Sequence, residues 1–113
     1  VTCYMYSPPY SILFWDNCAR TGNLTAEICA LERVFKQLLT HDNVRIFYFQ
    51  DEIDIITDLD NYRDYSHFDQ PVNHYMYECM KNGRDEVTID TYYDRLLAMY
   101  EFAAGYDYES AFH

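Results

Sequence analysis

Val44-Arg45-Ile46-Phe47-Tyr48-Phe49 is the stretch of sequence from which the fold can be deduced. Its side chains are nearly all apolar and β-prone, which is typical of a strand covered on both faces of a parallel sheet. Residues 24–39 predict a helix, because their apolar side chains recur at spacings of three and four. Residues 1–6 predict an earlier strand. The strands at 1–6 and 44–49 and the helix between them form a βαβ unit, so we expect parallel pairing and a right-handed connection.

Three further helices are expected around this unit. Consecutive prolines at Pro8 and Pro9 force a turn, after which residues 11–20 predict a helix that ends at Gly22. Pro71 suits the first turn of a helix over 71–81, and the last predicted helix covers 91–104. We expect residues 107–113 to form a frayed tail.

The prediction is therefore a helix-rich α/β fold of about two parallel strands and four helices, within a single domain of 113 residues. Two strands alone make a poor sheet. The chain also begins at Val1, without Met, in what looks like an interior strand. We therefore expect that it is part of a longer protein, and that further strands come from a missing N-terminal part or from a second copy in a homo-oligomer.

Composition narrows the classes of partner. The formal net charge is −11, with no cluster of Lys or Arg, which argues against binding to nucleic acid or to an anionic membrane surface. No run approaches the roughly 20 apolar residues of a membrane span, and we expect neither a signal peptide nor membrane contact in this segment. The 13 Tyr and 7 Phe residues suit half-buried helix flanks or interfaces.

The four cysteines are far apart and include no Cys-x-x-Cys pair, so the spacing of a zinc site is absent. Cys29 and Cys79 fall on predicted apolar helix faces. We expect them to be buried thiols rather than disulfide partners.

Asp64 and His67 are the candidate catalytic residues. They lie three residues apart, between the strand at 44–49 and the helix at 71–81. The connection that follows a parallel strand is where open α/β sheets place their sites. A neutral histidine there can accept a proton near pH 7, and a nearby carboxylate can hold its tautomer and stabilise the imidazolium.

Asp64-Tyr65-Ser66-His67 resembles the Asp-x-x-His block of SGNH/GDSL-type hydrolases, which lies between their last strand and C-terminal helix. The surrounding residues 56–68 and the string Tyr6-Ser7-Pro8-Pro9-Tyr10-Ser11 resemble a bacterial subgroup of uncharacterised, often membrane-anchored members. The resemblance covers nearly the whole chain. It implies the C-terminal portion of a flavodoxin-like three-layer sandwich, an extracytoplasmic location, and ester hydrolysis or acyl transfer, with an acylated carbohydrate as the substrate class.

The chain departs from that family in its nucleophile. The family's serine lies in an N-terminal Gly-Asp-Ser block, and its oxyanion-hole donors include a Gly and an Asn from two middle blocks. The three glycines and the serines Ser7, Ser11, Ser66 and Ser110 lack these settings. The resemblance therefore implies half of an esterase, which supplies Asp64 and His67 without the serine and is inactive alone.

Other functions stay open beside this one. His67, His74, Asp64 and Asp69 could meet at a metal, and the acidic residues between Asp51 and Asp60 could suggest calcium, but neither set has diagnostic spacing, so we expect no metal and no cofactor. Trp15 with Tyr10 and Phe14 suggests core packing more than a carbohydrate platform. The rival from a different class is a non-catalytic module that binds a protein partner through its Tyr-rich helix faces.

Overall fold

The computed structural model describes residues 1–64 and 67–111 and has three strands and six α-helices there. In chain order, the elements are β1 (Cys3–Ser7), α1 (Ile12–Arg20), α2 (Leu24–Leu38), β2 (Val44–Tyr48), α3 (Ile53–Ile56), a 3₁₀ turn (Leu59–Asn61), α4 (Gln70–Asn82), β3 (Glu86–Val87), α5 (Tyr92–Gly105) and α6 (Tyr108–Ala111). The predicted strands and the four longer helices are confirmed to within two residues at each end.

The sheet has the order β1-β2-β3, with β2 in the centre. β1 and β2 are parallel, in a register that runs from Cys3 opposite Val44 to Ser7 opposite Tyr48, and α1 and α2 connect them. β3 pairs antiparallel with β2. The expectation of two parallel strands is therefore incomplete, because the sheet is mixed and three-stranded. Two residues are too short to show the alternation by which a strand is recognised in sequence.

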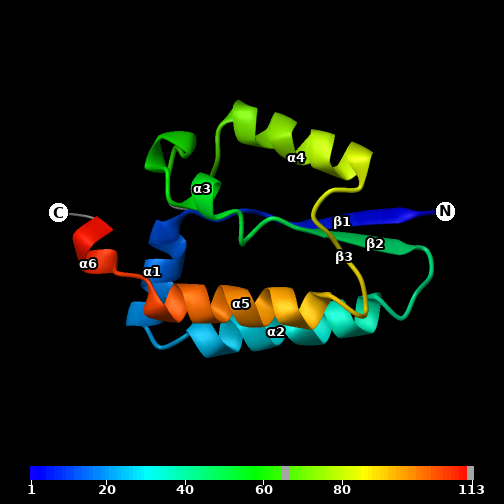
Figure 1. Ribbon diagram of the computed structural model, residues 1–113, viewed down its shortest axis with the longest axis horizontal. Coiled ribbons are helices and arrows are strands. Elements are labelled where there is room, and N and C mark those ends of the chain that lie inside the picture. Colours follow the sequence, from blue (N-terminus) through cyan, green and yellow to red (C-terminus); the bar gives the residue numbers. More distant parts are fainter. Residues whose placement is uncertain (65–66, 112–113) are drawn as a thin grey trace.

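The alternating side chains of β2 divide the core into two layers. Ile46 and Tyr48 pack on the side of α1, α2 and α5, whereas Phe47 packs on the opposite side with Met76 and Cys79 of α4. Figure 1 shows α4 on one side of the strands and the pair α2 and α5 on the other. All four residues Ile46–Phe49 are almost completely buried, which confirms the prediction of a strand covered on both faces.

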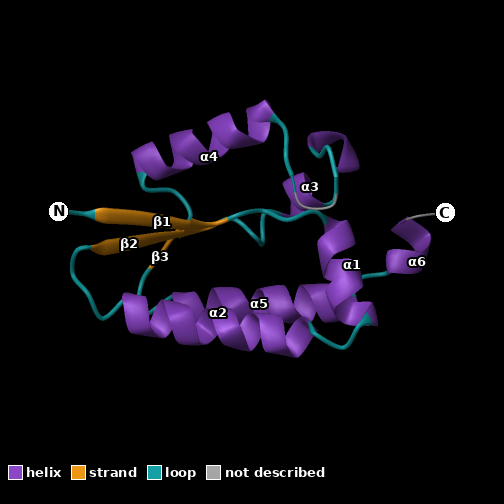
Figure 2. Ribbon diagram, turned by 180° about the vertical axis from the view of Figure 1, so that it is seen from behind, coloured by secondary structure: helices purple, strands orange, loops and turns teal. Residues whose placement is uncertain are grey.

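β1 differs from the interior strand that the sequence suggested. It is an edge strand, and its first four residues are exposed, from Cys3 to Tyr6. Its apolar side chains resemble those of an interior strand, but no helix of the described chain covers its outer part. Figure 2 shows β1 from the opposite side, running between α4 and the α2–α5 pair.

Two other expectations need correction. Residues 108–111 of the predicted frayed tail form α6, and the Tyr108 hydroxyl donates a hydrogen bond to the Ala103 carbonyl at 2.7 Å; residues 112–113 lie outside the described residues. Cys29 is exposed, because it lies beside the buried stripe of α2 and not within it. Cys79 is buried as predicted, and Cys3, Cys18, Cys29 and Cys79 are all free thiols.

Candidate functional site

The candidate site lies in the connection between the 3₁₀ turn and α4, which is called the turn below. Tyr62 and Phe68 form an antiparallel bridge at its base, and the Arg63 N–H donates to the His67 carbonyl at 2.8 Å. The Tyr62 hydroxyl donates to the carbonyl of Pro9, just beyond the end of β1, at 2.5 Å. Burial raises the pKa of Tyr62, so this hydroxyl remains a proton donor. The turn is thus attached to the carboxyl end of the parallel strand pair, where the sequence placed it.

Asp64 and His67 are in contact within this turn. His67 Nδ1 lies 2.7 Å from Oδ2 and 2.9 Å from Oδ1 of Asp64, and Oδ1 also accepts the backbone N–H of His67 at 2.8 Å. An ionised carboxylate can only accept hydrogen bonds, so Nδ1 is the donor, and the neutral form of this ring has its lone pair on Nε2. The histidine is therefore oriented as a base that acts through Nε2.

The two side chains are open to solvent, with 76% of His67 and 53% of Asp64 exposed. They border an open depression lined by Arg63, Phe68, Gln70 and Asn73. Arg63 Nε forms an ion pair with Asp69 Oδ1 at 3.0 Å, which ties the turn to the residue just before α4. A substrate could reach His67 from bulk water, but the site does not by itself exclude water as esterase sites do.

No nucleophile accompanies the pair in the described residues. Within 1–64 and 67–111, no serine, threonine or cysteine side chain is hydrogen-bonded to His67. Ser7 and Ser11 are buried, with the Ser7 hydroxyl accepting the Phe49 N–H at 3.4 Å, and Ser110 is bonded to Asp107. Ser66 lies outside the described residues. The arrangement can orient and relay a proton, and it needs a hydroxyl from elsewhere to perform acyl transfer.

The other candidates do not come together. Of the residues that the structure describes, no three His, Cys, Asp or Glu side chains are placed to hold a metal ion. His74 lies on α4 with its Nε2 4.0 Å from Glu78 Oε1, and Asp69 faces Arg63. Trp15 is fully buried and packs edge-on against Phe14, so it cannot serve as a carbohydrate platform.

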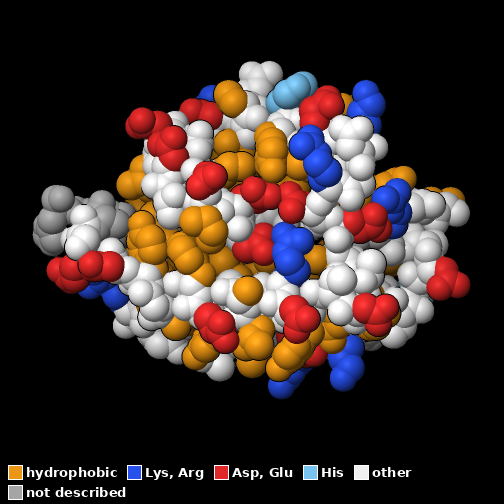
Figure 3. Space-filling view, in the orientation of Figure 1, with side chains coloured by type: hydrophobic (Ala, Val, Ile, Leu, Met, Phe, Trp, Pro, Cys, Tyr) orange, Lys and Arg blue, Asp and Glu red, His pale blue; other side chains and the backbone are white. Residues whose placement is uncertain are grey.

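A partly buried ionic cluster at the end of β2 was not predicted from the sequence. Arg95 of α5 makes a two-pronged ion pair with Asp51, with distances of 2.6 and 2.7 Å, and its Nη2 donates to the Tyr48 carbonyl at 3.0 Å. Asp85, which adopts the left-handed conformation at φ 65°, lies 3.4 Å from the same guanidinium. In the sequence, the acidic run that includes Asp51 looks like a solvent-exposed face, because Arg95, the cation that pairs with Asp51, is 44 residues away. Acidic and basic side chains gather near the middle of the face in Figure 3.

Glu52 is the titratable group of interest in this cluster. Burial, a hydrogen bond with the Asp85 carboxyl and the negative charges of Asp85 and Asp51 raise the pKa of Glu52 to about 8. Perturbed carboxyls occur at functional sites and also in structural ion-pair networks. Here Arg95 links β2, the residue before β3 and α5, which is the connectivity of a structural network.

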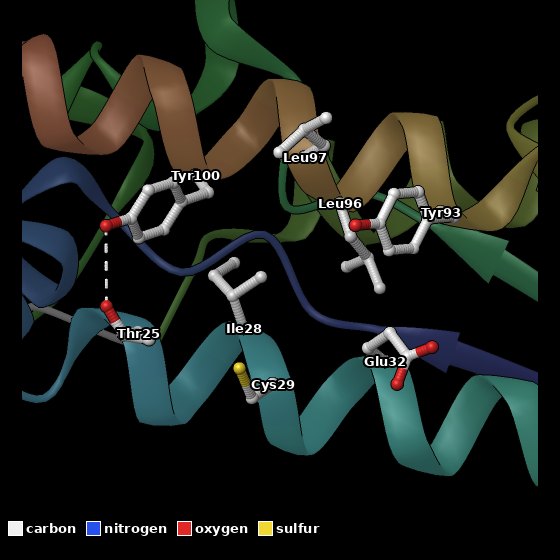
Figure 4. Close-up of a pocket in the computed structure, with 8 residues that line it drawn as sticks. All are labelled: Thr25, Ile28, Cys29, Glu32, Tyr93, Leu96, Leu97 and Tyr100. Carbon is white, nitrogen blue, oxygen red and sulfur yellow. Dashed lines mark hydrogen bonds between the residues drawn. The ribbon is translucent and has the colours of Figure 1, made fainter.

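An apolar groove of about 210 Å³ runs between α2 and α5. It is lined by Thr25, Ile28, Cys29 and Glu32 from α2 and by Tyr93, Leu96, Leu97 and Tyr100 from α5. Figure 4 shows these side chains converging from the two helices, with a hydrogen bond of 3.4 Å between the Thr25 and Tyr100 hydroxyls. The exposed Cys29 belongs to this groove.

Comparison with known proteins yields no relative. No family model, no curated protein and no solved structure matches this chain. Among the described helices, none has the length and apolar character needed to cross a membrane.

Proposed function

We propose that this chain supplies the Asp–His pair of an SGNH-type ester hydrolase or acyltransferase, and that the nucleophilic serine comes from another polypeptide segment. The observation that carries the proposal is the contact between Asp64 and His67 Nδ1 at 2.7 Å. Its place after the central parallel strand, beside the carboxyl ends of β1 and β2, supports it. The resemblance of residues 64–67 to the family's Asp-x-x-His block supports it independently.

The roles follow from the orientation of the ring. His67 Nε2 accepts the proton of the serine hydroxyl as its oxygen attacks the ester carbonyl, and returns that proton to the leaving alcohol when the C–O bond breaks. Water or a second alcohol then displaces the acyl group by the same route. Asp64 holds the Nδ1–H tautomer and stabilises the imidazolium in between. The substrate class that fits the resemblance is an acylated carbohydrate.

A fluorophosphonate probe, which labels activated serines, tests the proposal on the complete product of the gene that encodes this chain. We expect one labelled serine, and at least about a hundredfold slower labelling in the variant His67→Ala. His74→Ala is the matched control, since it removes an equally exposed histidine from the adjacent helix. Absence of a labelled serine, or equal labelling in the two variants, would refute the proposal.

The rival function, a protein-interaction module, has its own support. Large aromatic side chains are exposed on several elements, with Tyr4 and Tyr6 on β1, Tyr77 on α4 and Tyr93 on α5. Tyr suits interfaces because it combines a large apolar surface with a polar tip. In this alternative Asp64 only closes the turn through the His67 N–H, and the imidazole has no chemical role.

A further inference from the structure

The outer edge of β1 has no partner within residues 1–64 and 67–111. The Cys3 N–H donates to the Asn43 carbonyl at 2.7 Å, and the parallel register continues to Ser7. Because backbone groups alternate in direction along a strand, Cys3, Met5 and Ser7 face β2. Tyr4 and Tyr6 therefore direct their N–H and C=O groups outward, where they are available to another strand.

Thr2–Tyr6 of this edge include no charged side chain and no proline. Tyr4, Met5 and Tyr6 are 52%, 37% and 50% exposed, and residues 1–15 include no charged side chain in a chain of net charge −11. Natural proteins protect such edges with charges, prolines or bulges. The nearest cation, Arg45, is already paired with Glu86 at 2.6 Å.

The properties of the β1 edge indicate which kind of strand can pair with it. A partner strand must be extended and have one unpaired edge of its own. It must also be uncharged, since acidic side chains would lose their hydration next to the tyrosines of β1. In the described chain β1 meets these requirements, whereas β3, at the other edge of the sheet, is two residues long and includes Glu86. An uncharged edge is also where two copies of a chain of charge −11 can approach with least repulsion.

We propose that two copies of this chain pair β1 with β1 in antiparallel orientation, about a two-fold axis at Tyr4, to form a continuous six-stranded sheet. Outward-facing residues must pair with outward-facing residues, so Tyr4 lies opposite Tyr4 of the partner subunit and exchanges both backbone hydrogen bonds with it. Tyr6 lies opposite Thr2 of the partner subunit. An axis at Met5 would place Thr2 opposite Pro8 of the partner subunit, and Pro8 has no N–H to donate.

This arrangement extends an aromatic row that already exists in one copy. The Tyr4 and Phe47 ring centroids are 6.2 Å apart, and those of Tyr6 and Phe49 are 6.4 Å apart. The tyrosines therefore share the face of the sheet that α4 covers only in part. Pairing at the edge places the tyrosines of two copies next to one another on this face, and removes their exposed area from water.

Light scattering on the purified 113-residue chain at micromolar concentration tests the proposal. We expect a mass of twice 13.6 kDa. Tyr4→Glu places two carboxylates opposite each other on the axis, next to Arg45 in each copy, and should weaken dimerisation at least about tenfold. Tyr77→Glu, which makes the same change on exposed α4, should leave the dimer intact. A monomer in the wild type, or equal effects of the two variants, overturns the proposal.

A cross-link tests the register itself. Met5 faces Cys3 of the partner subunit at a non-hydrogen-bonded position, where Cα atoms are about 4.5 Å apart and a disulfide can form. In a Cys29→Ser background, Met5→Cys should give a disulfide-linked dimer on mild oxidation, and adding Cys3→Ser should abolish it. Val34→Cys, exposed on α2, is the control. Cross-linking through Val34→Cys alone would place the interface elsewhere and refute β1 pairing. Mass and cross-links do not depend on catalysis, so the hydrolase proposal and this one can fail separately.

Discussion

At the scale of residues, the Asp64–His67 pair is held by local geometry. A single carboxylate accepts both the backbone N–H and the ring Nδ1–H of a residue three positions later. Asp is suited to this because its short side chain closes turns onto nearby backbone groups. These two contacts orient the ring of a solvent-exposed histidine and select Nδ1 as the donor. Because Asp64 and His67 are close in sequence, the pair could be predicted from the sequence. The nucleophile that His67 would activate could not.

Glu52 gives a prediction on pH. Its folded-state pKa is about 8, against an ordinary value of 4.5, so the folded chain binds this proton more tightly than the unfolded chain. The stabilisation is fully present below about pH 4.5 and is lost as the pH rises through about 8. We expect Glu52→Gln, which imitates the protonated form, to lose less stability than the wild type between pH 5 and pH 9.

Urea unfolding at both pH values measures this difference. Glu101→Gln, an exposed carboxamide substitution on α5, controls for the loss of one negative charge. If wild type and Glu52→Gln lose stability in parallel as the pH rises, the Glu52 proton is not linked to folding.

At the scale of elements, the end of α4 depends on one glycine. Gly83 has φ 73°, and a Cβ there would meet nothing closer than Arg45 Nη2 at 3.9 Å. The cost of Gly83→Ala is therefore conformational, about 1 kcal/mol of unfolding free energy. Gly105, at the end of α5, has an ordinary φ and open space around it. Gly105→Ala should be neutral or stabilise by up to about 1 kcal/mol.

Thermal or urea unfolding of the two alanine variants under the same conditions provides the measurement. The difference between the two effects separates the cost of the backbone conformation from that of adding a methyl group. Equal destabilisation in both variants would contradict this account of the α4 terminus.

The elements that could be predicted are those whose side chains repeat with a period. The continuous apolar run of β2 indicated burial on both faces, and the three-and-four spacing in α2 indicated its packed stripe. β3 and α6 have two and four residues, too few for any period to appear. The edge position of β1 was not predictable either. Its apolar side chains give the same sequence pattern whether or not a neighbouring strand or helix covers them.

The same distinction applies to the site. Asp64 and His67 are three residues apart, so local sequence was sufficient to place them together. The Arg95–Asp51 pair joins residues 44 positions apart, and only the packing of α5 against the end of β2 brings them into contact. Acidic residues at the end of a buried strand are a weak signal for such a cation, and nothing in the sequence identified Arg95 as the partner.

At the scale of the whole molecule, we expect the 113-residue chain to have no esterase activity alone. His67 has no hydroxyl or thiol partner in the described residues, and a triad without its nucleophile loses nearly all of its catalytic advantage. Hydrolysis of p-nitrophenyl acetate should therefore proceed no faster than with free imidazole at the same concentration. His67→Ala serves as the reference. Turnover well above imidazole that disappears in this variant would mean that the chain has its own nucleophile.

The two sides of β2 also differ in how firmly they are held. Among the described residues, fourteen buried ones form the cluster on the α2–α5 side and four form the cluster under α4, so opening the α4 side exposes much less apolar surface. We therefore expect the amide hydrogens of α4 to exchange with solvent through local opening, and those of β2 to exchange only through global unfolding. On this view α4, which follows His67 in the chain, could separate from the sheet and repack while the larger cluster stays folded.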